Sequence, residues 1–256
     1  MPRRPTQDIE RGLADVVAAL GSIEIHSLPD HERKRLLRRL RDTLSHLRGF
    51  TDRLDVVQQP PMVLDPHHPD VLGGWIAQAM LQQPRHLLGA IPMFYGAGVY
   101  AIYYNGLHPA YTAIRGRDTP IYVGKADPES TVAALPIEQG LSLTKRLADH
   151  AKSIRRASNL EIADFECRFL VVTSGQQTAS EDHLLEYFQP VWNKIIKGFG
   201  KHGDSAKTRK NQRSQWDTLH PGRGWADEAG NTPNAQTAEQ LIERINEHFA
   251  KHPPRA

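Results

Sequence analysis

The chain has 256 residues, of which 39% are hydrophobic and 24% charged, a composition typical of a globular protein with one sizeable core. Its only cysteine, Cys167, excludes an intrachain disulfide and a cysteine zinc cluster and is typical of a reducing compartment. No apolar run approaches the roughly 18 residues of a membrane span, and none suits a signal peptide, so we expect a cytoplasmic protein that does not bind a membrane.

The formal net charge of +3 conceals two strongly basic segments. Between His31 and Arg48 there are seven Lys or Arg residues against two acids, and between Lys194 and Arg213 there are seven against Asp204 alone. Such clusters suit a polyanionic partner. A solvated helix face or a flexible tail explains them equally well, so charge alone leaves both interpretations open.

The N-terminal third reads as helical. Leucines recur at helical spacing, with arginines between them, at Leu36, Leu40, Leu44, Leu47 and Leu54. We predict helices over 8–20, 30–58 and about 70–83, with a proline-rich connector before the third. We interpret residues 1–90 as a helical extension that packs or forms a dimer, in preference to one that contacts DNA directly.

From Gly96 the pattern changes to β-prone runs separated by helices. Two tyrosine motifs, Gly98-Val99-Tyr100 and Tyr122-Val123-Gly124, lie in the first two predicted strands, and the turn-rich loop between them has room for extra strand. We take Ser142 as the N-cap of the following helix. The order is strand, strand, helix, strand and helix, over 99–104, 119–124, 142–158, 166–173 and 179–188. This order predicts an α/β (α+β) fold, with a small mixed or antiparallel sheet that has helices packed against its faces.

The C-terminal part divides into two kinds of sequence. The segment 197–213 is rich in Gly, Lys and Ser and has few apolar residues, so we expect a mobile or ligand-ordered loop. The denser run from Trp216 to Trp225 must pack against the rest of the protein, and a last helix over about 237–250 completes the chain. We therefore expect a core over 91–196 and a C-terminal extension over 197–256.

The tyrosines of the two motifs are candidates for chemistry. On adjacent strands, the Tyr100 and Tyr122 hydroxyls can converge on one side of the sheet. A free tyrosine has a pKa near ~10, so a role as a base requires a nearby cation or metal. Lys125, directly after the second motif, is a possible source of that perturbation.

The next helix supplies a second pair of candidates. Arg146 and His150 lie four residues apart, so they share one face. Arginine binds a phosphate with two hydrogen bonds, and histidine exchanges a proton near neutral pH. Whether Tyr100 or His150 is the general base stays open at this point.

The third group of candidates follows the last strand of the predicted sheet. Glu181 is a candidate ligand for Mg²⁺, since one carboxylate with waters and phosphate oxygens is a common way to hold that ion. Glu186 is its competitor. Asn193 follows in the run Gln189-Pro190-Val191-Trp192-Asn193.

The ordered set Tyr100, Tyr122, Arg146, His150, Glu181 and Asn193 resembles the GIY-YIG nuclease superfamily, whose members cut phosphodiester bonds with one metal ion. The resemblance covers roughly residues 96–195, with valine in place of isoleucine in both tripeptides. The family pattern Glu-x-x-L-I-x-x-x-x-P-x-x-N fits the stretch from Glu181 to Asn193. It therefore implies Glu181, and not Glu186, as the metal ligand and Asn193 as a residue that holds backbone or ligand.

The segment 214–226, which contains Trp216-Asp217-Thr218-Leu219-His220-Pro221-Gly222-Arg223, resembles the C-terminal part of type II restriction endonucleases that cut the palindrome CCGCGG. The resemblance implies double-strand cleavage of DNA by a homodimer in a prokaryotic cell, with Mg²⁺ that Mn²⁺ can replace. It also implies a DNA methyltransferase that acts on the same site. Since arginines read guanine, Arg209, Arg213 and Arg223 are candidate DNA-binding residues.

Two other functions share the same residues. A repair or structure-specific nuclease would use the same catalytic set on flaps, branches or lesions. A DNA-binding protein that kept the fold would bind without cutting. Contact of the three arginines with phosphates alone, and a structural role for His202 and His220, also stay open.

Overall fold

The computed structural model describes residues 6–54, 57, 65, 68–130, 132–200, 213–226 and 232–255. The chain divides into two compact units, Met1–Leu64 and Asp65–Ala256. Each unit is described by itself.

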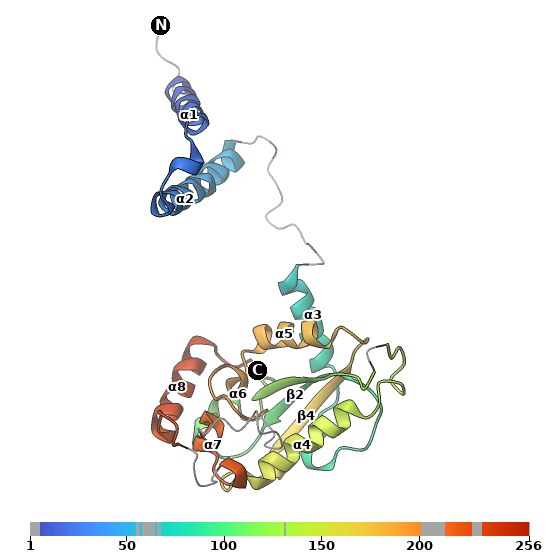
Figure 1. Cartoon of the computed structure of the whole chain (residues 1–256). Coiled ribbons are helices and arrows are strands. Elements are labelled where there is room, and N and C mark those ends of the chain that lie inside the picture. Colours follow the sequence, from blue (N-terminus) through green and yellow to red (C-terminus); the bar gives the residue numbers. More distant parts are fainter. Residues whose placement is uncertain are drawn as a thin grey trace. The chain divides into compact units, whose positions relative to one another are not determined.

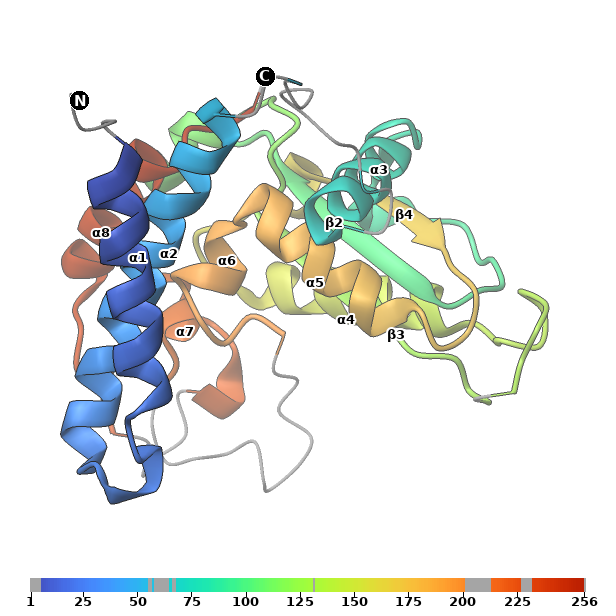
Figure 2. The same ribbon diagram turned by 90° about the horizontal axis from the view of Figure 1, so that it is seen from above.

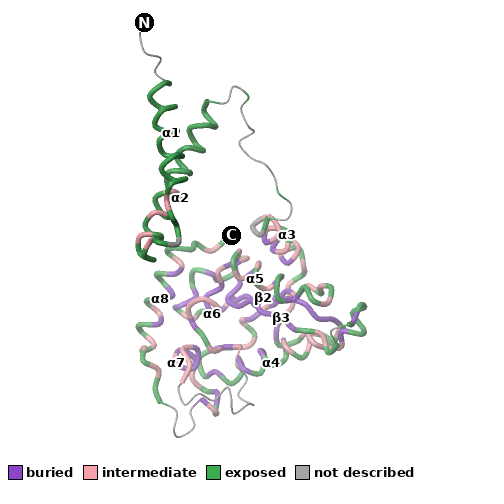
Figure 3. The backbone as a smooth tube through the Cα atoms, turned by 45° about the horizontal axis from the view of Figure 1, so that its top comes forward, coloured by how far each residue is buried: buried purple, intermediate pink, exposed green. Residues whose placement is uncertain are grey.

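The first unit consists of helices α1 (Thr6–Gly21) and α2 (Asp30–Leu54) with the short 3₁₀ helix η1 (Ile25–Ser27) between them. The two helices predicted here are therefore confirmed. Neither α1 nor α2 contains a buried residue, and both are coloured mainly as exposed in Figure 3. Several of their leucines and valines, among them Val16, Val17, Leu44 and Leu54, are exposed and form apolar surface.

The second unit is built on a four-stranded antiparallel sheet in the order β1-β4-β2-β3. The strands are β1 (His86–Leu87), β2 (Gly98–Tyr104), β3 (Tyr122–Ala126) and β4 (Phe165–Val171). The longer helices around it are α3 (Pro69–Leu81), α4 (Ser142–Arg156), α5 (Gln177–Phe188) and α8 (Ala238–Lys251). The shorter elements are η2 (Leu88–Ala90), η3 (Pro109–Ile114), η4 (Ile162–Asp164), α6 (Val191–Lys194), α7 (Gln215–Leu219) and η5 (Gly224–Ala226). The predicted fold class is confirmed.

Helices cover both faces of the sheet, as Figures 1 and 2 show. All seven residues of β2 are buried, and alternate ones face opposite sides. Tyr100, Ile102 and Tyr104 join the hydrophobic cluster that includes α4, and Val99, Ala101 and Tyr103 join the cluster with α3 and α5. Helix α3, within the expected N-terminal extension, packs against α5 and so belongs to the second unit.

Two motif glycines are required by close packing. A Cβ atom on Gly98 would lie 2.1 Å from the carbonyl oxygen of Leu170 on β4. A Cβ atom on Gly124 would lie 2.3 Å from the Tyr100 hydroxyl oxygen. Glycine in the second motif therefore gives the tyrosine of the first motif room to lie across β3.

Two local predictions need correction, and one short strand was not predicted. The loop after β2 contains the 3₁₀ helix η3 and no strand, because Pro109 sits at its start and the His108 ring accepts from the Ala110 amide. Ser142 is not an N-cap. Leu141 holds that position, and the Ser142 hydroxyl donates to the Gln139 carbonyl at 3.1 Å. The two-residue strand β1 was not predicted, since its position at the edge is set by pairing with β4 alone.

The C-terminal extension packs on the α4 side of the sheet. Phe199, Trp216, Leu241 and Ile245 are all buried in that cluster. The packing predicted for the tryptophan-rich run is confirmed for Trp216. The start of the expected loop over 197–213 does consist of turns, at 197–200, but Phe199 within it is fully buried. Residues 201–212 lie outside the described residues. In the part of the chain described, no helix is long and apolar enough to cross a membrane.

Candidate active site

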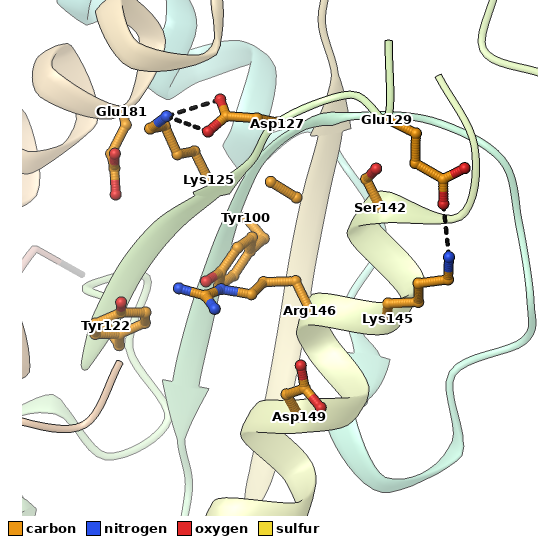
Figure 4. A pocket seen from close by; sticks show the side chains of 11 residues that line it. Tyr100, Tyr122, Lys125, Asp127, Glu129, Ser142, Lys145, Arg146, Asp149 and Glu181 are labelled. Carbon is orange, nitrogen blue, oxygen red and sulfur yellow. Dashed lines mark hydrogen bonds and ion pairs between the residues drawn. The ribbon is translucent and has the colours of Figure 1, made fainter. Parts of the chain in front are cut away.

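One cavity of about 540 Å³ opens beside the edge strand β3 and gathers five of the seven predicted catalytic residues. Figure 4 shows it from close by. Its walls come from β2, β3, α4, α5 and the segment after β3. They consist of Tyr100, Tyr122, Lys125, Ala126, Asp127, Glu129, Ser142, Lys145, Arg146, Asp149 and Glu181. Side chains from four separate elements thus converge on one space.

Tyr100 and Tyr122 lie on the same face of adjacent strands. Tyr122 pairs with Ile102, two residues along β2 from Tyr100, and the two rings lie 6.2 Å apart. The Tyr100 hydroxyl is hydrogen-bonded to Nε2 of His150 at 2.6 Å. His150 is fully buried and lies behind Tyr100, so it meets the cavity through that hydroxyl and does not line it.

Burial raises the pKa of Tyr100 well above its ordinary value, and the neighbouring Tyr122 raises it further, while Arg146 opposes the shift. The pKa of Tyr122 is also raised, again mainly by burial. Both phenols are therefore neutral at physiological pH. The Lys125 ammonium, expected to perturb a tyrosine, pairs with Asp127 at 2.6 Å, and the main influences on the pKa of Tyr100 are burial, Tyr122 and Arg146.

Arg146 extends from α4 across the cavity, and Figure 4 shows its guanidinium beside the Tyr100 hydroxyl. Its Nε is buried and has no hydrogen-bond partner among the described residues. A buried donor without a partner is costly, since it loses its bonds to water. Arg146 is therefore placed to bind an anion that enters the cavity.

Glu181 enters the same cavity from α5, which packs along β3. Burial raises the pKa of its carboxyl, while Lys125 lowers it and Asp182 and Asp127 raise it. Among the described residues there is no group of three or more His, Cys, Asp or Glu side chains that could enclose a metal. A single half-buried carboxylate suits an ion such as Mg²⁺ that keeps several waters and takes phosphate oxygens as further ligands.

Glu186, the competitor of Glu181 in the sequence, is exposed on α5 and lies 3.4 Å from Lys194. It does not line the cavity. Of the two carboxylates, Glu181 is the one that lines the cavity.

Asn193 supports the site from behind. Its side-chain amide donates to the Val123 carbonyl and accepts from the Val123 amide, both at 2.8 Å. These two bonds tie α6 to β3 beside Tyr122, as a further strand residue would. Asn193 does not line the cavity, and these two contacts of its side chain are with backbone.

The three arginines expected to bind DNA differ in their burial and contacts. Arg209 lies outside the described residues, as does His202. Arg213 is half-buried, and its Nε donates to the Asp217 carbonyl at 3.0 Å. Arg223 is not placed to read a base, because its side chain is 1% exposed and forms two bonds to the Asp217 carboxylate.

His220 has a structural place. It is fully buried, and its Nε2 is hydrogen-bonded to the Tyr111 hydroxyl at 2.6 Å and its Nδ1 to Asn159 at 2.9 Å. Burial lowers its pKa well below the ordinary value, so the ring is neutral.

Several cavity residues were not predicted from the sequence. Ser142, Lys145 and Asp149 share the face of α4 that carries Arg146, and their spacing of three to four residues is a usable signal. Phe199, which stacks on His150 at 4.7 Å, gave no such signal, since it is an isolated aromatic residue in a basic segment.

An antiparallel sheet with two convergent tyrosines and Arg146, His150 and Glu181 around them defines a GIY-YIG endonuclease domain, whose substrate is DNA. The family model described as the Eco29kI GIY-YIG domain matches residues 92–249, more than half of the chain. The chain therefore belongs to this family of restriction endonucleases, and GIY-YIG nucleases generally use divalent metals. A search of curated proteins finds no match.

Proposed function

We propose that the protein is a type II restriction endonuclease that cuts both strands of DNA at the palindrome CCGCGG with Mg²⁺, which Mn²⁺ can replace. Membership of the Eco29kI family supports restriction. The observation that carries the proposal is the convergence of Tyr100, Tyr122, Arg146 and Glu181 on one cavity. The resemblance of segment 214–226 to enzymes that cut CCGCGG supports the sequence of the site.

In this proposal the scissile phosphate lies in the cavity against Arg146. The guanidinium, with its buried Nε, binds the phosphate oxygens and stabilises the charge that builds up on them in the transition state. Lys145 pairs with Glu129 and Lys125 with Asp127, each at 2.6 Å. Unlike these two lysines, Arg146 forms no ion pair with any of the described residues. It is therefore the cavity cation best placed to bind the phosphate.

The nucleophilic water loses its proton through Tyr100 to His150. The raised pKa of Tyr100 disfavours a phenolate that acts alone as the base. Its hydroxyl can take the proton from water while passing its own proton across the 2.6 Å bond to Nε2 of His150. The histidine is then the final acceptor, and Tyr122 fixes the orientation of the water.

Glu181 would hold the metal ion, which supplies Lewis-acid polarisation of the scissile phosphate when bound. Asn193 keeps Tyr122 in place through its two bonds to Val123. Lys125 holds Asp127 at the cavity and moderates the pKa of Glu181.

The active form is a homodimer, because a palindrome presents two equivalent strands and one active site addresses one strand at a time. We assign residues 1–90 to packing or dimer formation and the basic segment 194–213, with Arg209 and Arg213, to DNA contact. A methyltransferase that acts on the same site protects the host DNA.

The test is incubation of the purified protein with phage DNA and Mg²⁺, without ATP, followed by sequencing of the fragment ends. We expect discrete fragments whose ends share one palindrome. Ends without a common sequence, or nicks confined to branches and flaps, would replace restriction by structure-specific cleavage. Binding without any cut under Mg²⁺ or Mn²⁺ would leave a DNA-binding protein.

A matched pair of variants on α5 tests the catalytic assignment. Glu181→Gln should retain DNA binding and lose about 10³-fold in cleavage rate, since the Lewis acid contributes several kcal/mol. Glu186→Gln, on the same helix but exposed, should cut at the wild-type rate. Equal rates for the two variants would show that Glu181 does not hold the metal.

A further inference from the structure

A buried ion pair in the C-terminal extension is bonded to the backbone of Phe199, whose ring stacks on the proposed catalytic histidine. Arg223 and Asp217 are each 1% exposed, and the guanidinium Nε and Nη2 donate to the two carboxylate oxygens at 2.6 and 2.9 Å. Trp216 and Trp225 place their rings 4.3 and 4.8 Å from the guanidinium carbon. Such a site fixes the guanidinium in one orientation and closes it to DNA.

Two further hydrogen bonds of Arg223 lead toward the active site. Its Nη1 donates to the Phe199 carbonyl at 3.2 Å, and its Nη2 donates to the Gly198 carbonyl at 3.0 Å. Gly198 has a φ of +118°, and a Cβ atom there would lie 2.2 Å from the Ser214 hydroxyl oxygen. The backbone on the N-terminal side of Phe199 is thus held by a rigid donor and by a conformation that favours glycine.

Phe199 connects this part of the backbone to the candidate catalytic residues through ring contacts. Its fully buried ring stacks on the His150 imidazole with centroids 4.7 Å apart and an interplanar angle of 19°. It also meets the Tyr122 ring edge-on at 4.9 Å. The imidazole therefore lies between Phe199 and Tyr100, so displacement of Phe199 changes the 2.6 Å bond from His150 to Tyr100.

We propose that Arg223, braced by Asp217, is a positioning residue that holds Phe199 against His150 and so sets the orientation of the proton acceptor. The role in cleavage rests on the proposed function, whereas the effect on the His150 ring does not. The C-terminal extension then positions the proton acceptor from behind the cavity, in addition to the DNA contact proposed for its basic segment.

Arg223→Lys is the variant that tests this role, because lysine keeps the charge but cannot bond the carboxylate and two carbonyls in the same fixed geometry. Its matched control is Arg168→Lys. Arg168 is also a buried arginine, pairs with Asp118 at 2.8 Å and donates to the Gln83 carbonyl at 2.9 Å, but it lies on the opposite face of the sheet. Loss of general stability affects both variants.

The first measurement is the ¹⁵N NMR signal of the His150 ring, assigned among the 13 histidines by its loss in His150→Gln. We expect Arg223→Lys to shift the His150 signal and Arg168→Lys to leave it in place. Phe199→Leu should shift it too, and Arg223→Lys should add nothing in the Phe199→Leu background. An unmoved signal in folded Arg223→Lys, or additive shifts in the double variant, would overturn the proposal.

The second measurement is cleavage at saturating DNA and Mg²⁺. A misplaced reacting group costs up to about 10²-fold, so we expect Arg223→Lys to lower kcat by about tenfold or more with KM unchanged. A wild-type kcat together with a shifted signal would overturn the catalytic part of the proposal. If Arg223→Lys does not fold, Asp217→Asn replaces it with the same outcomes. If the wild-type protein cuts no DNA, the proposed function is lost while the NMR comparison still decides the positioning role.

Discussion

The two faces of strand β2 carry similar residues with different surroundings. Tyr100 and Tyr103 are both fully buried, and each lies beside an arginine. On the Tyr103 face, Arg85 and Arg168 lie over the ring at 4.4 and 5.0 Å, and both bind the Asp118 carboxylate at 2.8 Å. On the Tyr100 face, Arg146 reaches into an open cavity.

The difference is in how the charges are satisfied. Arg85 also pairs with Glu166 at 3.0 Å, so the Tyr103 face has its own network of opposite charges. Among the described residues Arg146 has no such ion pair, and its Nε has no hydrogen-bond partner. A cluster of paired charges stabilises the fold. A hydrogen-bond donor in a cavity without a protein partner, such as the Arg146 Nε, can instead bind a ligand.

The largest contrast should come from removal of the two hydroxyls. Tyr100→Phe interrupts the path from water to His150, so the cleavage rate should fall by about 10²- to 10⁴-fold. Tyr103→Phe should cut at the wild-type rate, since Tyr103 does not line the cavity. Single-turnover rates across pH measure both, and an unchanged rate in Tyr100→Phe would remove that hydroxyl from the proton path.

The two arginines next to these tyrosines give the second contrast. Arg146→Lys should lose about 10²- to 10³-fold in cleavage rate, because the guanidinium donors that bind the phosphate oxygens in the transition state are lost. Arg85→Lys should lower thermal stability and leave the rate of the folded protein unchanged, because its partners are Asp118 and Glu166. Rates at saturating DNA, with melting curves, separate the two effects. A loss of rate in Arg85→Lys would contradict the division of roles between the faces.

A third contrast uses two glycines. A Cβ atom on Gly124 would collide with the Tyr100 hydroxyl, so Gly124→Ala should displace that hydroxyl and lower the rate by up to about 10²-fold. Gly74→Ala on α3 meets nothing within 4 Å and should raise stability by about 0.5–1 kcal/mol with the rate unchanged. Wild-type cleavage by Gly124→Ala would show that the tyrosine has room to move.

The smallest effect is the pH dependence of stability. Burial raises the pKa of Glu181, so the folded protein binds this proton more tightly than the unfolded chain. The stabilisation that comes from the protonated Glu181 carboxyl is therefore lost as pH rises above 4.5, the ordinary pKa of a glutamate. Metal-free Glu181→Gln should be more stable than wild type at pH 7 and equal to it below about pH 4.

Metal provides the internal check on this last prediction. Mg²⁺ binds the ionised carboxylate, so it should raise the melting temperature of wild type and leave that of Glu181→Gln unchanged. Equal stabilisation of the two proteins by Mg²⁺ would place the metal elsewhere.

The sequence by itself determined the fold class and the list of candidate residues. The alternation of apolar residues in β2 and the helical spacing of Arg146 and His150 follow from periods of two and 3.6 residues, which are local properties of the backbone. The two motif tyrosines, Glu181 and Asn193 could be chosen because their order along the chain resembles a family pattern.

Only the tertiary structure decided where each side chain lies and what it contacts. In the folded protein Asn193 is hydrogen-bonded to the Val123 backbone, and Lys125 pairs with Asp127. Arg223, which was expected from the sequence to bind DNA, is buried. It also brought Phe199 onto His150 from 49 positions away in the chain. Charge and residue type are visible in a sequence, but burial and the choice of partner depend on contacts between distant segments, which no local pattern encodes.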